Sequence, residues 1–341
     1  MTPRRAALAA TLTLLLSVGG VAFATPAAAC ACGGVAAPPG SEVTVGEEHA
    51  IVAWDGRVER IDLLLGLLTE ATETGIVLPT PSPATVSAGD RGDFDLLDEA
   101  RIPELVQVPD WWGVDDGADG GAGAPPDVLD AVTIGPVEAL TLAASDAAGL
   151  ERWLADNGYG IAPEVADLLA DYVAAGWYFV ALKLVGDAPL DGALNPIRVE
   201  FAADAPIYPL ALSRAATTPQ TVRLYLLGEH RQRVAWSTDP DAEPPVAVTV
   251  YAGPLAGTPA AAMGEYLTVV ELFIARPSVQ IEGDLVITRA PTDDEVGTEI
   301  RVSTPVTVGG IPLGWVLVGL AVLGVAGVTV ALAVVVRLRS A

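Results

Sequence analysis

Basic residues are scarce in this sequence. Its 341 residues include 18 Lys and Arg against 43 Asp and Glu, which gives a formal net charge of −25. Nucleic acid is therefore excluded as a default partner, because phosphate binding depends on clustered Lys and Arg. The same charge disfavours electrostatic docking of the chain onto an anionic membrane face.

Histidine and cysteine are equally sparse, with two of each. No His-x-x-x-His pair and no second Cys-x-Cys pair is present to complete a tetrahedral metal site. The acidic segment around Asp115 suggests Ca²⁺, but an EF-hand register starting there puts Gly117 at the third position and Pro126 at the twelfth, where a bidentate Glu is needed. A phosphate-binding loop and a dinucleotide fingerprint are also missing. We therefore expect no metal and no cofactor.

Cys30 and Cys32 are the only two cysteines. In an oxidising exterior, an even pair indicates a disulfide first. A bridge between positions i and i+2 closes a very small loop, so its entropic gain is small and strain makes it reducible. Lipidation of Cys30, metal binding by the two thiols and pairing between chains remain alternatives.

The N-terminus is typical of a secretory signal peptide. Arg4 and Arg5 precede the apolar run Ala6–Ala24, and three alanines stand directly before Cys30. We predict a signal peptide over Met1–Ala29. A permanent first membrane helix and a twin-arginine export signal are the alternatives.

The C-terminal region contains a long run without charge. Leu313–Val336 is long enough to cross about 30 Å of hydrocarbon, and Trp315 lies in its first turn. Arg337 and Arg339 follow the run directly, and positive charge is retained on the cytoplasmic side. We therefore predict a single-pass protein of the cell membrane, in which residues 30–305 lie outside, 306–312 form a linker, 313–336 span the membrane and 337–341 form a cytoplasmic tail. Gly310 and Gly314 have the spacing of a helix-dimer contact.

Turn residues separate short β-type segments in the exported part. Asp55-Gly56, between His49–Trp54 and Arg57–Leu65, predicts a β-hairpin with a type I′ turn. Thr74–Leu78 is expected as a strand that Pro79, Pro81 and Pro83 end. Between residues 109 and 127 the chain is dominated by Gly, Asp, Ala and Pro, which predicts a flexible loop.

Helices are fewer than strands in this part. We expect them at Asp93–Arg101, from a cap at Ser145 or Asp146 to Asp156, and at Pro163–Ala175, with Gly158 and Gly176 ending the last two. After Gly176 the apolar period becomes two, which predicts strands at Trp177–Val185, Ile197–Phe201, Ile207–Ser213, Thr221–Leu227, Arg233–Ser237, Val246–Tyr251, Leu267–Ile274, Asp284–Thr288 and Glu299–Val306. The fold class predicted is α+β, with mainly antiparallel sheets, a few short helices and one C-terminal transmembrane helix.

Residues that could carry chemistry do not form a known catalytic motif. There is no Gly-x-Ser-x-Gly elbow, and His230 lies in what reads as a polar turn. Lys183, the only lysine, is expected on one strand face with Phe179 and Ala181, either reaching the sheet edge or buried with a function. Trp111-Trp112 is a candidate platform for a sugar or a protein partner, or else packs its loop onto the body.

Several segments together resemble a bacterial family of exported proteins catalogued as a domain of unknown function. They are Cys30–Gly34, Trp54–Gly56, Ile76–Pro83, Trp153–Tyr159 with its Asn-Gly-Tyr end, Gly176–Leu184 and Ala205–Ser213. The resemblance covers roughly Cys30–Arg231. It implies an exported, often membrane-anchored domain and supplies no catalytic residues. Some relatives have a further Cys soon after the Gly-Gly pair, where this chain has Val35-Ala36-Ala37, so the resemblance implies no disulfide pattern for this chain.

The sequence thus favours a non-catalytic binding or scaffolding domain of the bacterial envelope, with an envelope protein or a glycan as partner. The alternative is an extracytoplasmic hydrolase acting on cell-wall or peptide substrates. Convergence of His230, a carboxylate and a Ser or Thr in one cleft would favour the hydrolase.

Overall fold

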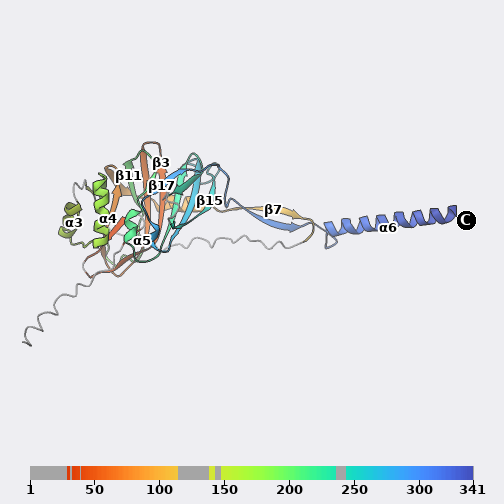
Figure 1. Cartoon of the computed structure of the whole chain (residues 1–341), viewed down its shortest axis with the longest axis horizontal. Helices are drawn as coiled ribbons and strands as arrows, with labels where there is room; N and C mark the ends of the chain where they lie inside the picture. Colours follow the sequence, from red (N-terminus) through yellow and green to blue (C-terminus); the bar gives the residue numbers. More distant parts are fainter. Residues whose placement is uncertain are drawn as a thin grey trace, which may run out of the picture.

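The computed structural model describes residues 29–30, 33–38, 40–113, 138–142, 147–235 and 243–340. They form a layered body from which a narrow stalk and a long C-terminal helix project (Figure 1). In the body two β-sheets pack face to face, and helices cover the outer face of each sheet. The predicted α+β class with mainly antiparallel sheets is confirmed.

The larger sheet has eight strands in the order β15-β16-β13-β3-β4-β11-β6, with β10 paired to β4. Its neighbours are antiparallel except for β3 and β13, which are parallel. The strands are β3 (Val43–Trp54), β4 (Val58–Thr69), β6 (Ala84–Ala88), β10 (Gly192–Ala193), β11 (Ile197–Ala202), β13 (Gln220–Gly228), β15 (Val246–Pro254) and β16 (Tyr266–Ile274).

The smaller sheet has five strands in the order β1-β2-β5-β9-β8. They are β1 (Ala29–Cys30), β2 (Gly33–Ala36), β5 (Glu73–Thr80), β8 (Glu138–Leu142) and β9 (Tyr178–Val185). Pro79 does not end its strand as predicted, because β2 pairs only with Gly75–Val77. Beyond that point β5 pairs with β9 alone, so the missing N–H of Pro79 breaks no ladder on the other side.

The core explains why the second half of β4, from Leu63 to Leu67, contains no polar residue. Ile61, Leu63 and Leu65 pack between the two sheets, whereas Leu64 packs on the opposite face against the α2 layer. A strand covered on both faces has no solvent side, so its sequence is a continuous apolar run rather than an alternating one.

The β3–β4 hairpin is confirmed, but its turn differs from the prediction. The Asp55 N–H donates to the Val58 carbonyl at 3.2 Å, so Gly56 and Arg57 are the central residues. Only Gly56 has a positive φ, of 93°. A positive φ at the first central position alone is the type II′ pattern rather than type I′.

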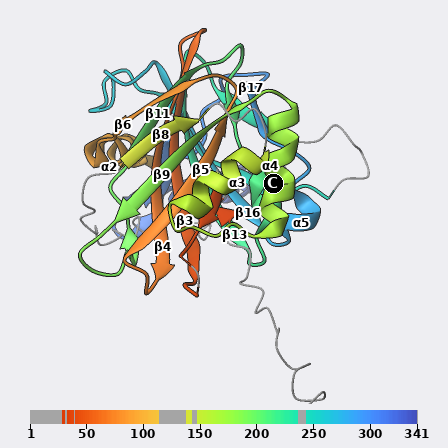
Figure 2. The same cartoon turned by 90° about the vertical axis from the view of Figure 1, so that its left-hand side faces the viewer.

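Helices cover both sheets. Helix α2 (Arg91–Ala100), which Asp90 caps, places Phe94 and Leu97 on the larger sheet. Helices α3 (Ala147–Asp156) and α4 (Pro163–Ala174) cover the smaller sheet, and Figure 2 shows them in front of β5 and β9. Positive φ at Gly158 and Gly176 ends these two helices as predicted. The predicted caps Ser145 and Asp146 lie outside the described residues.

A third, three-stranded sheet has the order β12-β17-β14, formed by β12 (Ile207–Tyr208), β14 (Gln232–Ala235) and β17 (Leu285–Arg289). The strand predicted over Ile207–Ser213 is wrong beyond Tyr208. A 3₁₀ helix, η1 (Ala211–Ala215), replaces it, because the Asp284 carboxylate accepts the N–H groups of Leu210 and Ala211 and turns the chain there. A short helix, α5 (Pro277–Gln280), packs beside η1.

The stalk is a parallel pair of strands, β7 (Glu104–Asp110) and β18 (Glu299–Pro305). β7 was not predicted. It includes Pro109 and Asp110, the first two residues of the predicted loop. Residues 114–127 of that loop lie outside the described part of the chain. A small hairpin follows, with β19 (Thr307–Val308) and β20 (Ile311–Pro312) around Gly309 and Gly310.

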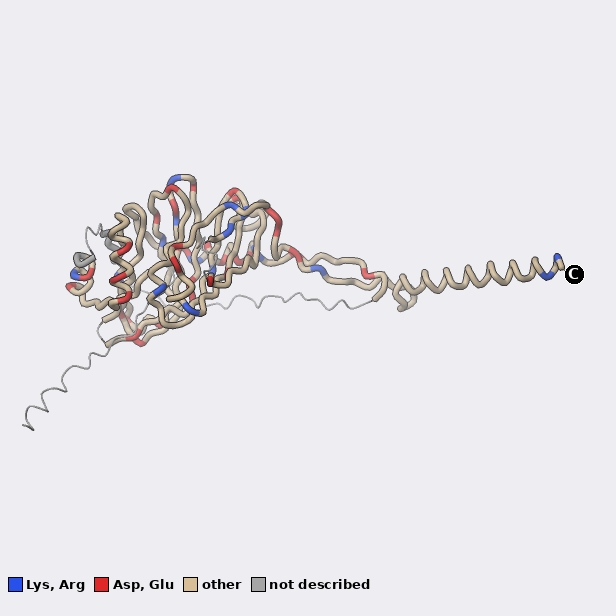
Figure 3. The backbone as a smooth tube through the Cα atoms, in the orientation of Figure 1, with Lys and Arg blue, Asp and Glu red and all other residues tan. Residues whose placement is uncertain are grey.

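Helix α6 (Leu313–Arg339) begins directly after this hairpin and is long and apolar enough to cross a membrane. Only Gly314 is buried in it, and its charges are confined to Arg337 and Arg339 at its far end (Figure 3). The predicted apolar C-terminal helix of membrane-span length is confirmed.

Candidate functional site: an acidic groove beside the first hairpin

Two cavities of about 370 and 360 Å³ are both lined in part by the tip of the β3–β4 hairpin. Trp54 and Asp55 from the hairpin, with Gly228 and Glu229 from the turn after β13, line both cavities. The two cavities therefore form one groove, and we call it the acidic groove. The Trp54 indole N–H donates to the Ala203 carbonyl at 3.0 Å, which fixes the ring at the edge of the groove.

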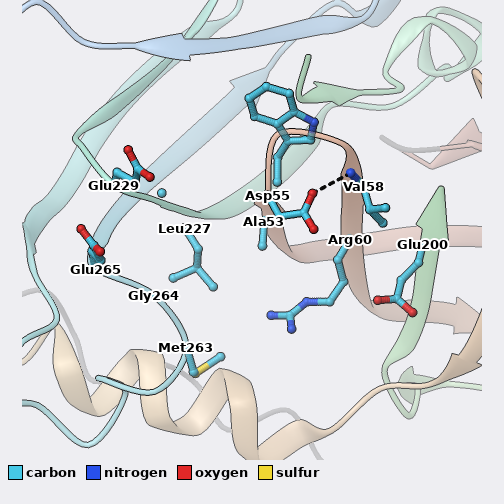
Figure 4. A pocket seen from close by; sticks show the side chains of 12 residues that line it. Ala53, Asp55, Val58, Arg60, Glu200, Leu227, Glu229, Met263, Gly264 and Glu265 are labelled. Atoms are coloured by element: carbon cyan, nitrogen blue, oxygen red, sulfur yellow. Dashed lines mark hydrogen bonds between the residues drawn. The ribbon is translucent and has the colours of Figure 1, made fainter. Parts of the chain in front are cut away.

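Carboxylates dominate the polar lining of the first cavity. Asp55, Glu200, Glu229 and Glu265 surround it, and Arg60 is its only Arg or Lys. Figure 4 shows Arg60 and Glu200 at one side and Glu229 and Glu265 at the other. Within the part of the chain that the structure describes, the last three carboxylates form no ion pair, whereas Arg60 pairs with Asp62 at 3.3 Å.

Backbone N–H groups of the turn stabilise the ionised form of the Asp55 side chain. Its Oδ1 accepts the N–H groups of Val58 and Arg57 at 2.8 and 2.9 Å, and these two bonds lower the pKa of Asp55 below its ordinary value. Apolar side chains, among them Leu227 and Met263, form the rest of the lining. Such a groove suits a ligand that carries positive charge beside an apolar group.

His230 lies in the second cavity, where it forms a dyad with Asp293. Its Nδ1 lies 2.8 Å from Asp293 Oδ2, and this bond is the largest cause of the lowered pKa of Asp293. The Arg231 N–H donates to the other oxygen of Asp293 at 3.1 Å. Both side chains of the dyad are partly exposed.

Thr288 lines the same cavity but does not complete a triad. Its Oγ1 is buried and has no hydrogen-bond partner, so it reaches neither His230 nor solvent. The structure therefore brings His230 together with a carboxylate, whereas Thr288, the hydroxyl residue in the described lining of this cavity, does not act as its nucleophile.

The second histidine, His49, is a buried residue of β3. It packs edge-on against Tyr225, with 6.4 Å between ring centroids. Burial is the main reason why its pKa falls to about 4, and the nearby Arg223 adds to the effect. His49 is therefore neutral at neutral pH and belongs to the packing between α2 and the larger sheet.

Buried carboxylates are a feature that the sequence did not reveal. Glu59 accepts the Ile207 N–H with both oxygens at 3.0 and 3.1 Å, and burial raises its pKa to about 8. Glu48 accepts from the Tyr208 hydroxyl, and Asp284 accepts from the Tyr172 hydroxyl. These groups tie β12 and η1 to the body, which is a structural role.

The remaining candidates lie apart from the groove. Lys183 is half-buried on the helix-covered face of the smaller sheet, with its Nζ 5.8 Å from the centre of the Tyr159 ring. Trp111 and Trp112 lie at the far end of the stalk. Cys32 and the side chain of Cys30 lie outside the described residues. Among the residues that are described, no group of three His, Cys, Asp or Glu could hold a metal ion.

Residues 26–288 match the family described as "Uncharacterized protein conserved in bacteria (DUF2330)". The chain belongs to this family. The match contains every residue that lines the first cavity of the acidic groove, and it ends before Asp293, β18 and α6. DUF2330 extends further along the chain than Arg231, where the resemblance noted from the motifs ends.

A comparison with curated proteins gives no match. Among solved structures, the crystal structure of baculovirus P35 is similar to this chain, over 73% of this chain and 97% of the P35 chain, with 9% sequence identity and a TM-score of 0.35. A likeness at this score supports no inference about function.

Proposed function

We propose that this chain is a single-pass, membrane-anchored protein of the bacterial envelope. In this proposal the signal peptide over residues 1–29 directs export, residues 30–305 lie outside, and α6 crosses the cell membrane with its Arg337 end inside. The observation that carries it is α6, a helix of 27 residues that is apolar and, apart from Gly314, unburied. Exposure of its apolar side chains to water is unfavourable, whereas the hydrocarbon of a bilayer would surround these side chains.

The body then acts as a non-catalytic binding or scaffolding domain for an envelope protein or a glycan. The acidic groove supports this role, because it combines unpaired carboxylates with an apolar lining. A partner with a basic segment fits this chemistry best, and its binding should weaken steeply as salt concentration rises.

Protease treatment of intact cells tests the anchored topology. We expect an antibody against the body to lose its full-length band when protease is added to intact cells, while a cytoplasmic marker stays whole. Loss of the band only after lysis would place the body inside and contradict the proposal.

An extracytoplasmic hydrolase remains the second candidate, because His230 and Asp293 do form a dyad in the groove. Wild-type protein and His230→Ala should be assayed side by side on peptidoglycan and on a protein substrate. We expect no hydrolysis by either one. If the wild type hydrolyses a substrate and His230→Ala does not, the protein is a hydrolase and the non-catalytic proposal is wrong.

A further inference from the structure

The stalk brings two tryptophans to the start of α6 that are far from it in sequence. β7 and β18 run in the same direction away from the body, so Trp111 and Trp112, which follow β7, reach the same level as the first turn of α6 (Figure 1). There the Trp112 ring packs edge-on against Trp315, with 5.8 Å between ring centroids. Three indoles therefore gather at one end of the helix.

Backbone contacts hold this tryptophan cluster, formed by Trp111, Trp112 and Trp315, in place. The Gly314 N–H donates to the Trp111 carbonyl at 2.6 Å. Asp110 Oδ1 accepts the N–H groups of Trp112 and Gly113 at 2.8 and 3.0 Å. The cluster is thus a built part of the junction between stalk and helix.

Gly314 permits this approach because it has no side chain. A Cβ at this position would lie 2.5 Å from the Trp112 ring and 2.7 Å from the Trp111 carbonyl oxygen. Gly310 lies before the helix, in the β19–β20 turn, with a φ of 82°. Gly314, which has the spacing of a helix-dimer contact with Gly310, therefore receives a tryptophan of the same chain.

The packed tryptophans still expose much apolar surface. Trp111, Trp112 and Trp315 are 48%, 49% and 58% exposed. The first two line a shallow cavity of about 420 Å³ with Gly314, Leu317, Val318 and Ala321 of α6, and no charged residue lines it. The exposed surface is continuous with the apolar surface of the helix.

The depth of the cluster follows from the length of α6. A hydrocarbon core of about 30 Å takes roughly 20 residues at 1.5 Å per residue. Counted back from Arg337 at one boundary, it ends near Leu317. Trp315, the Trp112 ring packed against it and the adjacent Trp111 then lie at the opposite boundary, where indole rings are favoured.

We propose that Trp111 and Trp112 insert into the lipid headgroup and upper acyl region of the leaflet that faces the body, so that the protein contacts the bilayer through two separate chain segments. This inference rests on the proposed membrane anchoring. Lipid is the ligand that fits this cavity best, because no charged residue lines it and its lining is continuous with the apolar surface of α6. An inserted indole also needs no basic residues, which suits a chain that is strongly acidic.

Fluorescence quenching by brominated lipid tests the proposal. Full-length protein is reconstituted in phosphatidylcholine vesicles containing lipid that is brominated either high on the acyl chain or near its methyl end. We expect the upper bromine to quench tryptophan emission more than the lower one. Trp111→Phe/Trp112→Phe should reduce the quenched emission about two-fold or more, because two of the three boundary indoles are gone.

Matched variants separate the possible outcomes. Trp153→Phe should leave the quenched emission unchanged, because α3 lies at the opposite end of the body (Figure 1). Trp315→Phe should lower the quenched emission even if Trp111 and Trp112 do not insert into the bilayer. Quenching that depends on Trp315 but not on Trp111 and Trp112 would overturn this inference and leave the anchor intact, whereas no quenching of any variant would overturn both.

A contact between copies is the remaining occupant to exclude. With one chain per nanodisc no second copy is present, so quenching of Trp111 and Trp112 should persist there. Its absence under that condition would overturn the proposal.

Discussion

The body and the stalk with α6 differ in where their apolar side chains go. In the body, three buried clusters fill the space between the sheets and beneath the helices. In the stalk and α6, apolar side chains such as Leu105, Val302 and Leu320 are exposed, and Gly314 is the only residue of α6 that is buried. The body therefore carries its own core, whereas the other region lacks one and depends on surroundings that the chain itself does not supply.

Removal of α6 should give the largest effect and test this division directly. We expect a chain that ends at Ile311 to leave the membrane fraction almost completely, because no other apolar segment of the described chain is long enough to span a bilayer. The free energy of unfolding of the body, measured in the same detergent, should change by less than about 0.5 kcal/mol. Retention of the truncated chain in the membrane, or loss of its folding, would contradict the division.

Leucine truncations compare the two regions one residue at a time. Leu67→Ala should lower the free energy of unfolding by about 2–5 kcal/mol, because Leu67 is fully buried between the sheets and its loss leaves a cavity. Its neighbour Leu68 is 59% exposed, so Leu68→Ala is the matched control and should cost less than about 0.5 kcal/mol.

Leu320→Ala in α6 extends the same comparison. Leu320 is 61% exposed, and its truncation should leave denaturant unfolding of the body unchanged. A loss of stability as large as that of Leu67→Ala would mean that α6 packs on the body.

Glu59 should make the stability of the body depend on pH. Burial raises its pKa to about 8 from an ordinary value near 4.5. Between these two values the folded state keeps a proton that the unfolded state has lost, so stability falls as pH rises through this window. The loss should amount to a few kcal/mol by about pH 8, at roughly 1.4 kcal/mol per pKa unit.

Chemical denaturation at a series of pH values measures this dependence. Glu59→Gln still accepts the Ile207 N–H but cannot ionise, so it should flatten the curve between about pH 5 and pH 8. Leu68→Ala changes no titrating group and should keep the wild-type slope. An unchanged slope in Glu59→Gln would assign the pH dependence to other groups, such as Asp284, whose pKa is also raised by burial.

Local signals in the sequence predicted much of the body. The Asp55-Gly56 turn, the helix ends at Gly158 and Gly176 and the uncharged C-terminal run each depend on a few adjacent residues, and all mark real elements. For two of the wrong predictions, the cause lies in another part of the chain. Pro79 is tolerated because β2 is short, and Asp284 turns the chain after Tyr208.

The candidate site was less accessible to sequence reasoning. His230 was singled out, but nothing distinguished Asp293 among 43 acidic residues. The first cavity of the acidic groove combines residues from β3, β4, β11, β13 and three turns, so it exists only after folding. The stalk was also not predictable from the sequence, because parallel pairing of two distant segments leaves no local sequence pattern.

The parallel ribbon of β7 and β18 also decides how the protein would respond to mechanical load. A pull on α6 enters β18 along its own axis, and β7 lies beside it in the same direction. Their cross-strand hydrogen bonds are then loaded together in shear, rather than opened one after another as in a hairpin peeled from its end. The two strands thus act as a stiff strut of about 20 Å, at roughly 3.3 Å per residue, that passes tension from α6 into the sheets.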